Sequence, residues 1–204
     1  MRSSSIRCCA AVLATAVLAG SQPASAVEAP TIGVYFDAAG TVCKGTVEPG
    51  VPAMVYVVLR FDGAEIAAAG TEFRFVGMPP SWIVYAEADP GILAIGDPFA
   101  GGVSAGFTQC KGAMGEPFAV YSILILAQEP EDDLEFEART KVPSSNRNFQ
   151  CPVVVACDSP FFTAHCVESV RCRINSFRPP TCAALTAVTA SSWTAVKGLY
   201  AGTR

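Results

Sequence analysis

The sequence is poor in residues on which many catalytic and nucleic-acid-binding proteins depend. It contains a single histidine, His165, and charged residues make up only 16% of it. No C-x-x-C pair is present, and no lysine follows the glycines of residues 101–106. The motifs of thioredoxin-type redox proteins and of phosphate-binding loops are therefore both missing. With a formal net charge of −4 and no basic patch, the chain is not expected to bind nucleic acid.

The sequence also lacks an apolar run long enough to span a membrane. The N-terminal candidate, residues 8–19, is shorter than the roughly 20 residues that a spanning helix needs. Arg2 and Arg7 precede this run, and the small residues Ala24-Ser25-Ala26 follow it. This layout is typical of a secretory signal peptide. We therefore predict that residues 1–26 are removed and that the mature chain has no membrane span. It is expected to work outside the cell, at the cell surface or in the periplasm.

Short strand-forming segments make up most of the remaining chain. Runs rich in Val, Ile, Phe and Tyr recur at intervals of roughly 10 to 14 residues between Gly, Pro and Asp turns, which is typical of antiparallel sandwiches. The predicted strands are Thr31–Phe36, Val42–Val47, Met54–Phe61, Glu72–Val76, Trp82–Tyr85, Ile92–Ile95, Val103–Thr108, Phe118–Leu126 and Leu134–Ala138. Helical patterns are confined to one possible turn at Ala64–Ala69 and to the segment Ser192–Tyr200.

These segments predict an all-β fold, an antiparallel β-sandwich stabilised by disulfides, with a short C-terminal helix. The sandwich domain is expected over residues 27–176, a length that can bury a sizeable core. A proline-containing linker and the short helix are expected over residues 177–204.

Seven of the nine cysteines lie beyond the signal peptide, and in an exported chain they are expected to form disulfides. Cys151, Cys157, Cys166 and Cys172 are spaced symmetrically about residues 161–162. A single antiparallel hairpin would set Cys157 opposite Cys166 and Cys151 opposite Cys172, with both pairs on one face. We predict these two bridges.

Three further cysteines complete the set. Cys43 can pair with Cys110 across the domain, which leaves Cys182 unpaired, and a Cys172–Cys182 bridge is the open alternative. A four-thiolate zinc site fits the spacing poorly. Ligand pairs in structural zinc sites favour gaps of two to four residues, whereas the gaps here are five residues long. No cofactor is expected.

Residues 102–106 read GVSAG and match G-x-S-x-G, the pattern of the nucleophile turn in many serine hydrolases. The order Ser104, Asp158, His165 is also the order of the triad in α/β-hydrolases. That motif needs a buried strand before the serine and a helix after it. Here Asp97-Pro98 precedes the motif and no helical pattern follows. We interpret the segment as a glycine-rich turn and keep a small secreted serine hydrolase as an alternative.

Two groups of carboxylates suggest other chemistry. The run Glu129–Asp133 offers the oxygen ligands that calcium prefers, so a calcium-dependent adhesion module is a further alternative. The run lacks the Asp/Asn and Gly pattern of known calcium loops and equally suits a solvated hairpin tip. Glu135 and Glu137 share one face of a strand and could form the carboxylate pair of a glycosidase. Their alternation with Leu134 and Phe136 explains them more simply.

The layout of Pro52–Ala127 resembles a cohesin-type or carbohydrate-binding-type sandwich. The features are a long opening strand at Val55–Phe61, the segment Gly70–Phe75, a glycine-rich turn and a second long strand. The tail Trp193–Tyr200 resembles the W-x-x-[VI]-K-x-L-[YF] ends of uncharacterised exported proteins from environmental bacteria. Neither resemblance implies a known activity.

The sequence as a whole predicts an exported, non-catalytic binding or structural module. Its ligand is expected to be a protein or a glycan. Trp82, Tyr85, Trp193 and Tyr200 are candidates for a glycan-stacking surface, although aromatic residues of a sandwich more often lie in the core. The sequence does not indicate an oligomeric state.

Overall fold

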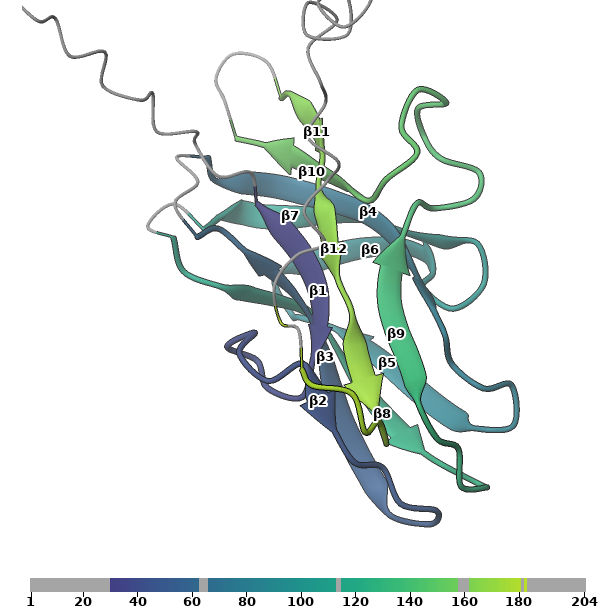
Figure 1. The fold of residues 1–204 in the computed structure, drawn as a ribbon. Coiled ribbons are helices and arrows are strands. Elements are labelled where there is room, and N and C mark those ends of the chain that lie inside the picture. The colour runs from purple at the N-terminus through teal and green to yellow at the C-terminus, as the bar shows by residue number, and fades with distance from the viewer. Residues whose placement is uncertain (1–29, 63–65, 113–114, 158–161, 181, 183–204) are drawn as a thin grey trace, which may run out of the picture.

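The computed structural model describes residues 30–62, 66–112, 115–157, 162–180 and 182. Within these residues the fold is all-β, and the strands form two sheets packed as a sandwich (Figure 1). No helix long and apolar enough to cross a membrane occurs in this part of the chain. The predicted signal peptide and the predicted helix at Ser192–Tyr200 lie outside the described residues.

The first sheet has five strands in the order β12-β1-β3-β8-β5. Neighbouring strands are antiparallel, except that β12 and β1 run parallel. The strands are β1 (Thr31–Tyr35), β3 (Pro52–Arg60), β5 (Ile83–Ala88), β8 (Phe118–Leu126) and β12 (Glu168–Val170).

The second sheet follows the order β11-β10-β4-β9-β13-β2, and β7 pairs with both β4 and β6. β13 and β2 are parallel, so the sandwich is mixed rather than purely antiparallel. The strands are β2 (Lys44–Gly45), β4 (Ala68–Val76), β6 (Ile92–Asp97), β7 (Gly102–Lys111), β9 (Leu134–Arg139), β10 (Val153–Ala156), β11 (Ala164–Cys166) and β13 (Cys172–Ile174).

The strand β4 changes its partner halfway along. Its residues 68–72 pair with β10, and its residues Arg74–Val76 pair with β9. Residues 140–152 connect β9 to β10 (Figure 1). They therefore begin beside Arg74 of β4 and end beside Glu72 of the same strand. We refer to this segment as the β9–β10 loop. It forms one wall of the cavity described below.

The core between the sheets is aromatic and aliphatic. Phe73 on β4 meets Tyr121 on β8 edge-to-face at 6.0 Å, which joins the two sheets. Phe136 makes similar contacts with Phe75 at 5.3 Å and with Trp82 at 6.1 Å. Such edge-to-face pairs add stability beyond the area that they bury.

Of the four candidates for a glycan-stacking surface, the structure excludes Trp82. Trp82 is only 5% exposed and belongs to the core, whereas Tyr85 is 63% exposed. Trp193 and Tyr200 lie outside the described residues. The helical turn considered at Ala64–Ala69 is also corrected, because Ala68 already pairs with β10 and β7 as part of β4.

Three disulfides connect the sheets and loops, and they differ from the predicted pairings. The bridges are Cys43–Cys182, Cys110–Cys157 and Cys151–Cys166, with Cα–Cα distances of 5.4, 6.1 and 5.5 Å. Cys172 is a buried free thiol. The predicted Cys157–Cys166, Cys151–Cys172 and Cys43–Cys110 bridges are thus wrong, and Cys182 is not the unpaired residue.

The hairpin prediction was wrong because the chain leaves the hairpin early. β10 and β11 do pair, but in a register that sets Val153 opposite Cys166. This register brings Cys151, two residues before Val153, within bridging distance of Cys166. The chain then crosses to the first sheet as β12 and returns as β13 beside β9. Cys172 is carried away with β13 and becomes part of the core.

Candidate functional site

Ser104 lies within β7, so the GVSAG segment is the start of a strand and not the glycine-rich turn expected from the sequence. Its side chain is held by a carboxylate and an ammonium group. Its hydroxyl donates a hydrogen bond to Glu72 Oε2 at 2.9 Å and accepts one from Lys141 Nζ at 2.8 Å. Lys141 Nζ also lies 3.5 Å from Glu72 Oε2. The Ser104 hydroxyl therefore lies between the donating ammonium group of Lys141 and the accepting carboxylate of Glu72.

The predicted partners of Ser104 are not brought to it. The pairing of β7, β4, β10 and β11 sets Ser104, Glu72, Val153 and Cys166 in one row. His165 belongs to the neighbouring row, three strands from β7, which is a distance of about 14 Å at the usual strand spacing. Its side chain also points to the opposite face from that of Ser104, because side chains alternate along a strand. Asp158 lies outside the described residues.

Glu72 fastens the β9–β10 loop to the sheet. It accepts hydrogen bonds from the backbone N–H of Ser145 at 2.9 Å, from the Ser145 hydroxyl, and from the Ser144 hydroxyl at 3.1 Å. Burial alone would raise the pKa of Glu72, but these hydrogen bonds and that from Ser104 outweigh it and hold the pKa below its ordinary value. The ionised carboxylate therefore acts as an anchor for the loop.

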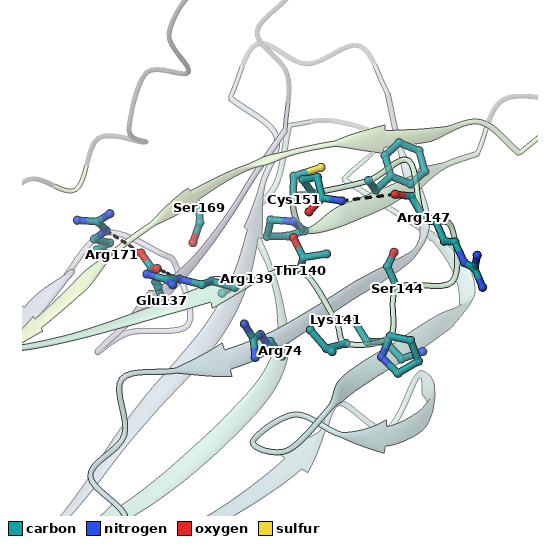
Figure 2. Close-up of a pocket in the computed structure, with 16 residues that line it drawn as sticks. Arg74, Glu137, Arg139, Thr140, Lys141, Ser144, Arg147, Cys151, Ser169 and Arg171 are labelled. Carbon is teal, nitrogen blue, oxygen red and sulfur yellow. Dashed lines mark hydrogen bonds and ion pairs between the residues drawn. The ribbon is translucent and has the colours of Figure 1, made fainter.

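Beside this anchor lies a cavity of about 820 Å³. Its walls are residues 137–139 of β9, residues 140–144, 147 and 149–152 of the β9–β10 loop, Arg74 of β4, and Ser169 and Arg171. Figure 2 shows the labelled side chains arranged around this space. We call it the arginine pocket, after its five cationic side chains: Arg74, Arg139, Lys141, Arg147 and Arg171.

Positive charge dominates the arginine pocket. Glu137 is the one carboxylate among its lining residues, and it is paired with Arg139 and, at 2.6 Å, with Arg171. Two carboxylates behind the wall also take part. Glu72 pairs with Lys141, and Glu135 pairs with Arg171 at 3.2 Å. Glu135 also pairs with Arg173 at 3.3 Å. Six cations against three carboxylates leave an excess of three positive charges in a chain whose formal net charge is −4.

Arg74 carries much of this excess. It lies directly opposite Arg139 in the β4–β9 pair, an arrangement of like charges that is destabilising in a sheet. Among the described residues no carboxylate pairs with Arg74, and its Nε is buried without a hydrogen-bond partner. The hydroxyl of Ser169, on another wall of the pocket, is buried without a partner in the same part of the chain.

The carboxylates proposed for a glycosidase or a calcium site have other partners. Glu135 and Glu137 both accept hydrogen bonds from Arg171. Asp133, at the end of the acidic run, pairs with Arg178 at 2.9 Å and accepts a hydrogen bond from Ser176 at 2.6 Å. Within the described ranges no group of three or more His, Cys, Asp or Glu side chains is placed to hold a metal ion.

The sequence alone does not predict the arginine pocket, because its cationic residues are far apart along the chain. Arg74 and Arg171 are almost a hundred residues apart, and no local window is basic. The alternation of Glu135, Glu137 and Arg139 along one strand face was a signal that could have been used. This alternation predicts a half-buried strand. In the structure Glu137 and Arg139 line the pocket, and Glu135 lies behind its wall and pairs with Arg171.

Comparison with known proteins shows a likeness of fold. No protein-family model matches the chain, and no curated protein matches it. Among solved structures, the seventh type I cohesin of ScaB from Pseudobacteroides cellulosolvens has a TM-score of 0.48 at 11% identity, covering 78% of this chain and 96% of that one. The cohesin module of a family 33 glycoside hydrolase from Clostridium perfringens has a TM-score of 0.46 at 9% identity, covering 72% and 99%.

A type III cohesin of ScaE from Ruminococcus flavefaciens gives a TM-score of 0.42 at 15% identity, covering 72% and 87%. The strand pairing of the chain itself shows a β-sandwich, and the solved structures that it weakly resembles are cohesin modules. Likeness of this degree concerns the arrangement of strands. The properties of the arginine pocket have to be argued from its own residues.

Proposed function

We propose that the chain is an exported, non-catalytic binding module that holds its ligand in the arginine pocket. The observation that carries the proposal is the pocket itself. Its volume of about 820 Å³ lies within the range of roughly 300–1,000 Å³ that is common for ligand sites. Its walls come from both sheets and from a loop that Glu72 anchors, so the cavity is formed before a ligand arrives.

Export is supported by two independent features. Residues 1–26 have the layout of a signal peptide, and three disulfides are typical of proteins that fold in an oxidising compartment. We expect N-terminal sequencing of protein recovered from the periplasm or the medium to begin near Val27. Full-length protein retained in the cytoplasm would contradict export.

A non-catalytic role is supported by the surroundings of Ser104. The hydroxyl is bonded to Glu72 and Lys141, and His165 lies three strands away. Purified protein treated with a fluorophosphonate probe is expected to show no gain in intact mass. A gain of one probe that is lost in Ser104→Ala would overturn the proposal and establish an activated serine.

Binding itself is tested by thermal unfolding with a panel of neutral oligosaccharides, acidic oligosaccharides and acidic peptides. A ligand present at 100 times its Kd stabilises the folded state by about 2.7 kcal/mol. For a chain of this size that corresponds to a rise in Tm of roughly 5–10 °C. Failure of every member of the panel to raise Tm would count against a binding module.

A further inference from the structure

We infer that the arginine pocket binds an acidic carbohydrate, a sugar chain that carries carboxylate or sulfate groups. This inference rests on the proposed function, because it identifies the ligand class of the same pocket. The argument has three steps: the excess charge, the unsatisfied donors, and the other side chains that line the pocket.

The excess charge calls for an anion. Two of the five cations have no carboxylate partner within the described residues: Arg74 on β4 and Arg147, which is exposed on the β9–β10 loop. Guanidinium groups match the geometry of planar carboxylates and of sulfate oxygens, and they bond to both in a bidentate manner. Since Arg74 comes from β4 and Arg147 from the β9–β10 loop, a ligand that satisfies both needs more than one anionic group or a rigid body between its contacts.

The unsatisfied donors indicate where the anion lies. Arg74 Nε and Ser169 Oγ are buried, and neither has a hydrogen-bond partner in the part of the chain that the structure describes. Leaving a buried donor unpaired costs about 1–3 kcal/mol. An oxyanion bound beside Arg74 would accept a hydrogen bond from its Nε and would also relieve the repulsion between Arg74 and Arg139 across the β4–β9 pair.

The remaining lining favours a sugar over a peptide. Thr140 and Gln150 also line the pocket, and their hydroxyl and amide groups suit the hydroxyl groups of a sugar ring. Phe149 and Pro143 add flat apolar surfaces on which a sugar ring can pack. A peptide bound as an added strand would need a free edge of β4 beside Arg74, and β9 occupies that position.

Isothermal titration calorimetry of the mature chain with four probes tests the inference. The probes are a galacturonate hexasaccharide, a sulfated heparin-type hexasaccharide, the neutral maltohexaose, and a hexaglutamate peptide. We expect one or both acidic sugars to bind, and maltohexaose to bind at least tenfold more weakly. Binding should weaken as the salt concentration rises, since charge pairs at an open pocket are screened.

Variants link the binding to the pocket. Arg74→Gln and Arg147→Gln are each expected to raise the Kd for the acidic sugar by about tenfold or more, because each removes a charge-assisted hydrogen bond. Arg178→Gln is the matched control, since Arg178 pairs with Asp133 outside the pocket. Without ligand, Arg74→Gln should melt no lower than the parent chain, because it removes a like-charge pair. If Arg74 had a purely structural role, its substitution would lower the melting temperature and leave the Kd for the acidic sugar unchanged.

The contrary outcomes are distinct. If maltohexaose binds in the pocket as tightly as the acidic sugars do, the inference of an acidic ligand is overturned, but the proposed binding module is not. Tighter binding of hexaglutamate than of either acidic sugar would replace the sugar with an acidic peptide. Sugar binding that both pocket variants leave unchanged would show that the site is elsewhere. Absence of binding by all four probes, together with no stabilisation by the wider panel, would overturn the proposed function as well.

Discussion

The hydroxyl of Ser104 and the carboxylate of Glu72 form a hydrogen bond of 2.9 Å that joins β7 to β4 on the outer face of the sheet. The serine of an apparent hydrolase motif is thus one of several donors to an anchoring carboxylate. Ser144, Ser145 and Lys141 approach the same carboxylate from the β9–β10 loop. The loop that walls the arginine pocket therefore depends on the charge of one side chain.

The first prediction concerns the pH dependence of this anchor. Because the pKa of Glu72 is lower in the folded chain than in the unfolded chain, its ionised form stabilises the fold at pH values above about 4.3, the unfolded value. That contribution is lost as the pH falls from about 5 through the lowered pKa. Glu72→Gln should be less stable at pH 7 by about 1–3 kcal/mol, and its stability should depend less on pH in this acidic range.

Urea unfolding between pH 3 and pH 7 measures both effects. Glu87→Gln, which changes an exposed carboxylate on β5, serves as the control and should follow the parent chain. If the free energy of unfolding falls with pH equally in Glu72→Gln and in the parent chain, Glu72 is not the cause of the loss of stability in acid.

The second prediction concerns two glycines of the GVSAG segment. Gly102 has a φ of 105°, and a Cβ there would lie 2.6 Å from the carbonyl oxygen of Phe73 and 2.9 Å from side-chain atoms of Arg74 and Lys141. Gly106 has open space around the position of a Cβ. Gly102→Ala should therefore destabilise the fold by about 2 kcal/mol or more, whereas Gly106→Ala should change stability by less than about 1 kcal/mol. Thermal unfolding of the two variants, side by side, gives the comparison. Equal losses would mean that the backbone at Gly102 is not constrained as described.

Runs of strand-forming residues predicted the strands correctly where the long-range pairing follows the local composition. The predicted segment Phe118–Leu126 coincides with β8, and Met54–Phe61 matches β3 to within two residues at each end. The start of β4 was missed because an alanine-rich stretch has no strand composition of its own. Pairing of Ala68 with β10 on one side and β7 on the other overrides that local preference.

Long-range pairing accounts for what the sequence could not show. The parallel contact of β12 with β1 joins residues more than 130 positions apart, and no periodicity reports it. That contact ends the hairpin at Cys166 and so changes the disulfides. It also carries Ser169 and Arg171 to the wall of the arginine pocket, which for this reason could not be assembled from the sequence alone.

The third prediction concerns Arg171, whose guanidinium joins two carboxylates of β9. Its Nε lies 2.6 Å from Glu137, which is only 6% exposed, and its Nη1 lies 3.2 Å from Glu135. Arg171→Gln would leave Glu137 with a single cationic partner, Arg139, in a buried position. We expect a loss of about 1–3 kcal/mol in urea unfolding at pH 7.

The exposed pair Arg178–Asp133 provides the contrast for this measurement. Its side chains are 61% and 39% exposed, so Arg178→Gln should cost no more than about 0.5–1 kcal/mol. A smaller loss for Arg171→Gln than for Arg178→Gln would contradict the view that Glu137 is a buried carboxylate held by Arg171.

The last prediction concerns Cys172, the free thiol of the described residues. It is fully buried, and burial raises its pKa to about 12, so at pH 8 it should present almost no thiolate to a reagent. We expect iodoacetamide to leave the folded mature chain unmodified and to add a single alkyl group once the chain is unfolded in guanidinium chloride. Peptide mapping should then place that group on Cys172 and recover Cys43–Cys182, Cys110–Cys157 and Cys151–Cys166 as linked pairs. A linked pair of Cys151 and Cys172 would restore the single hairpin and would remove the crossing that brings Arg171 to the arginine pocket, whereas alkylation of Cys182 would contradict the Cys43–Cys182 bridge alone.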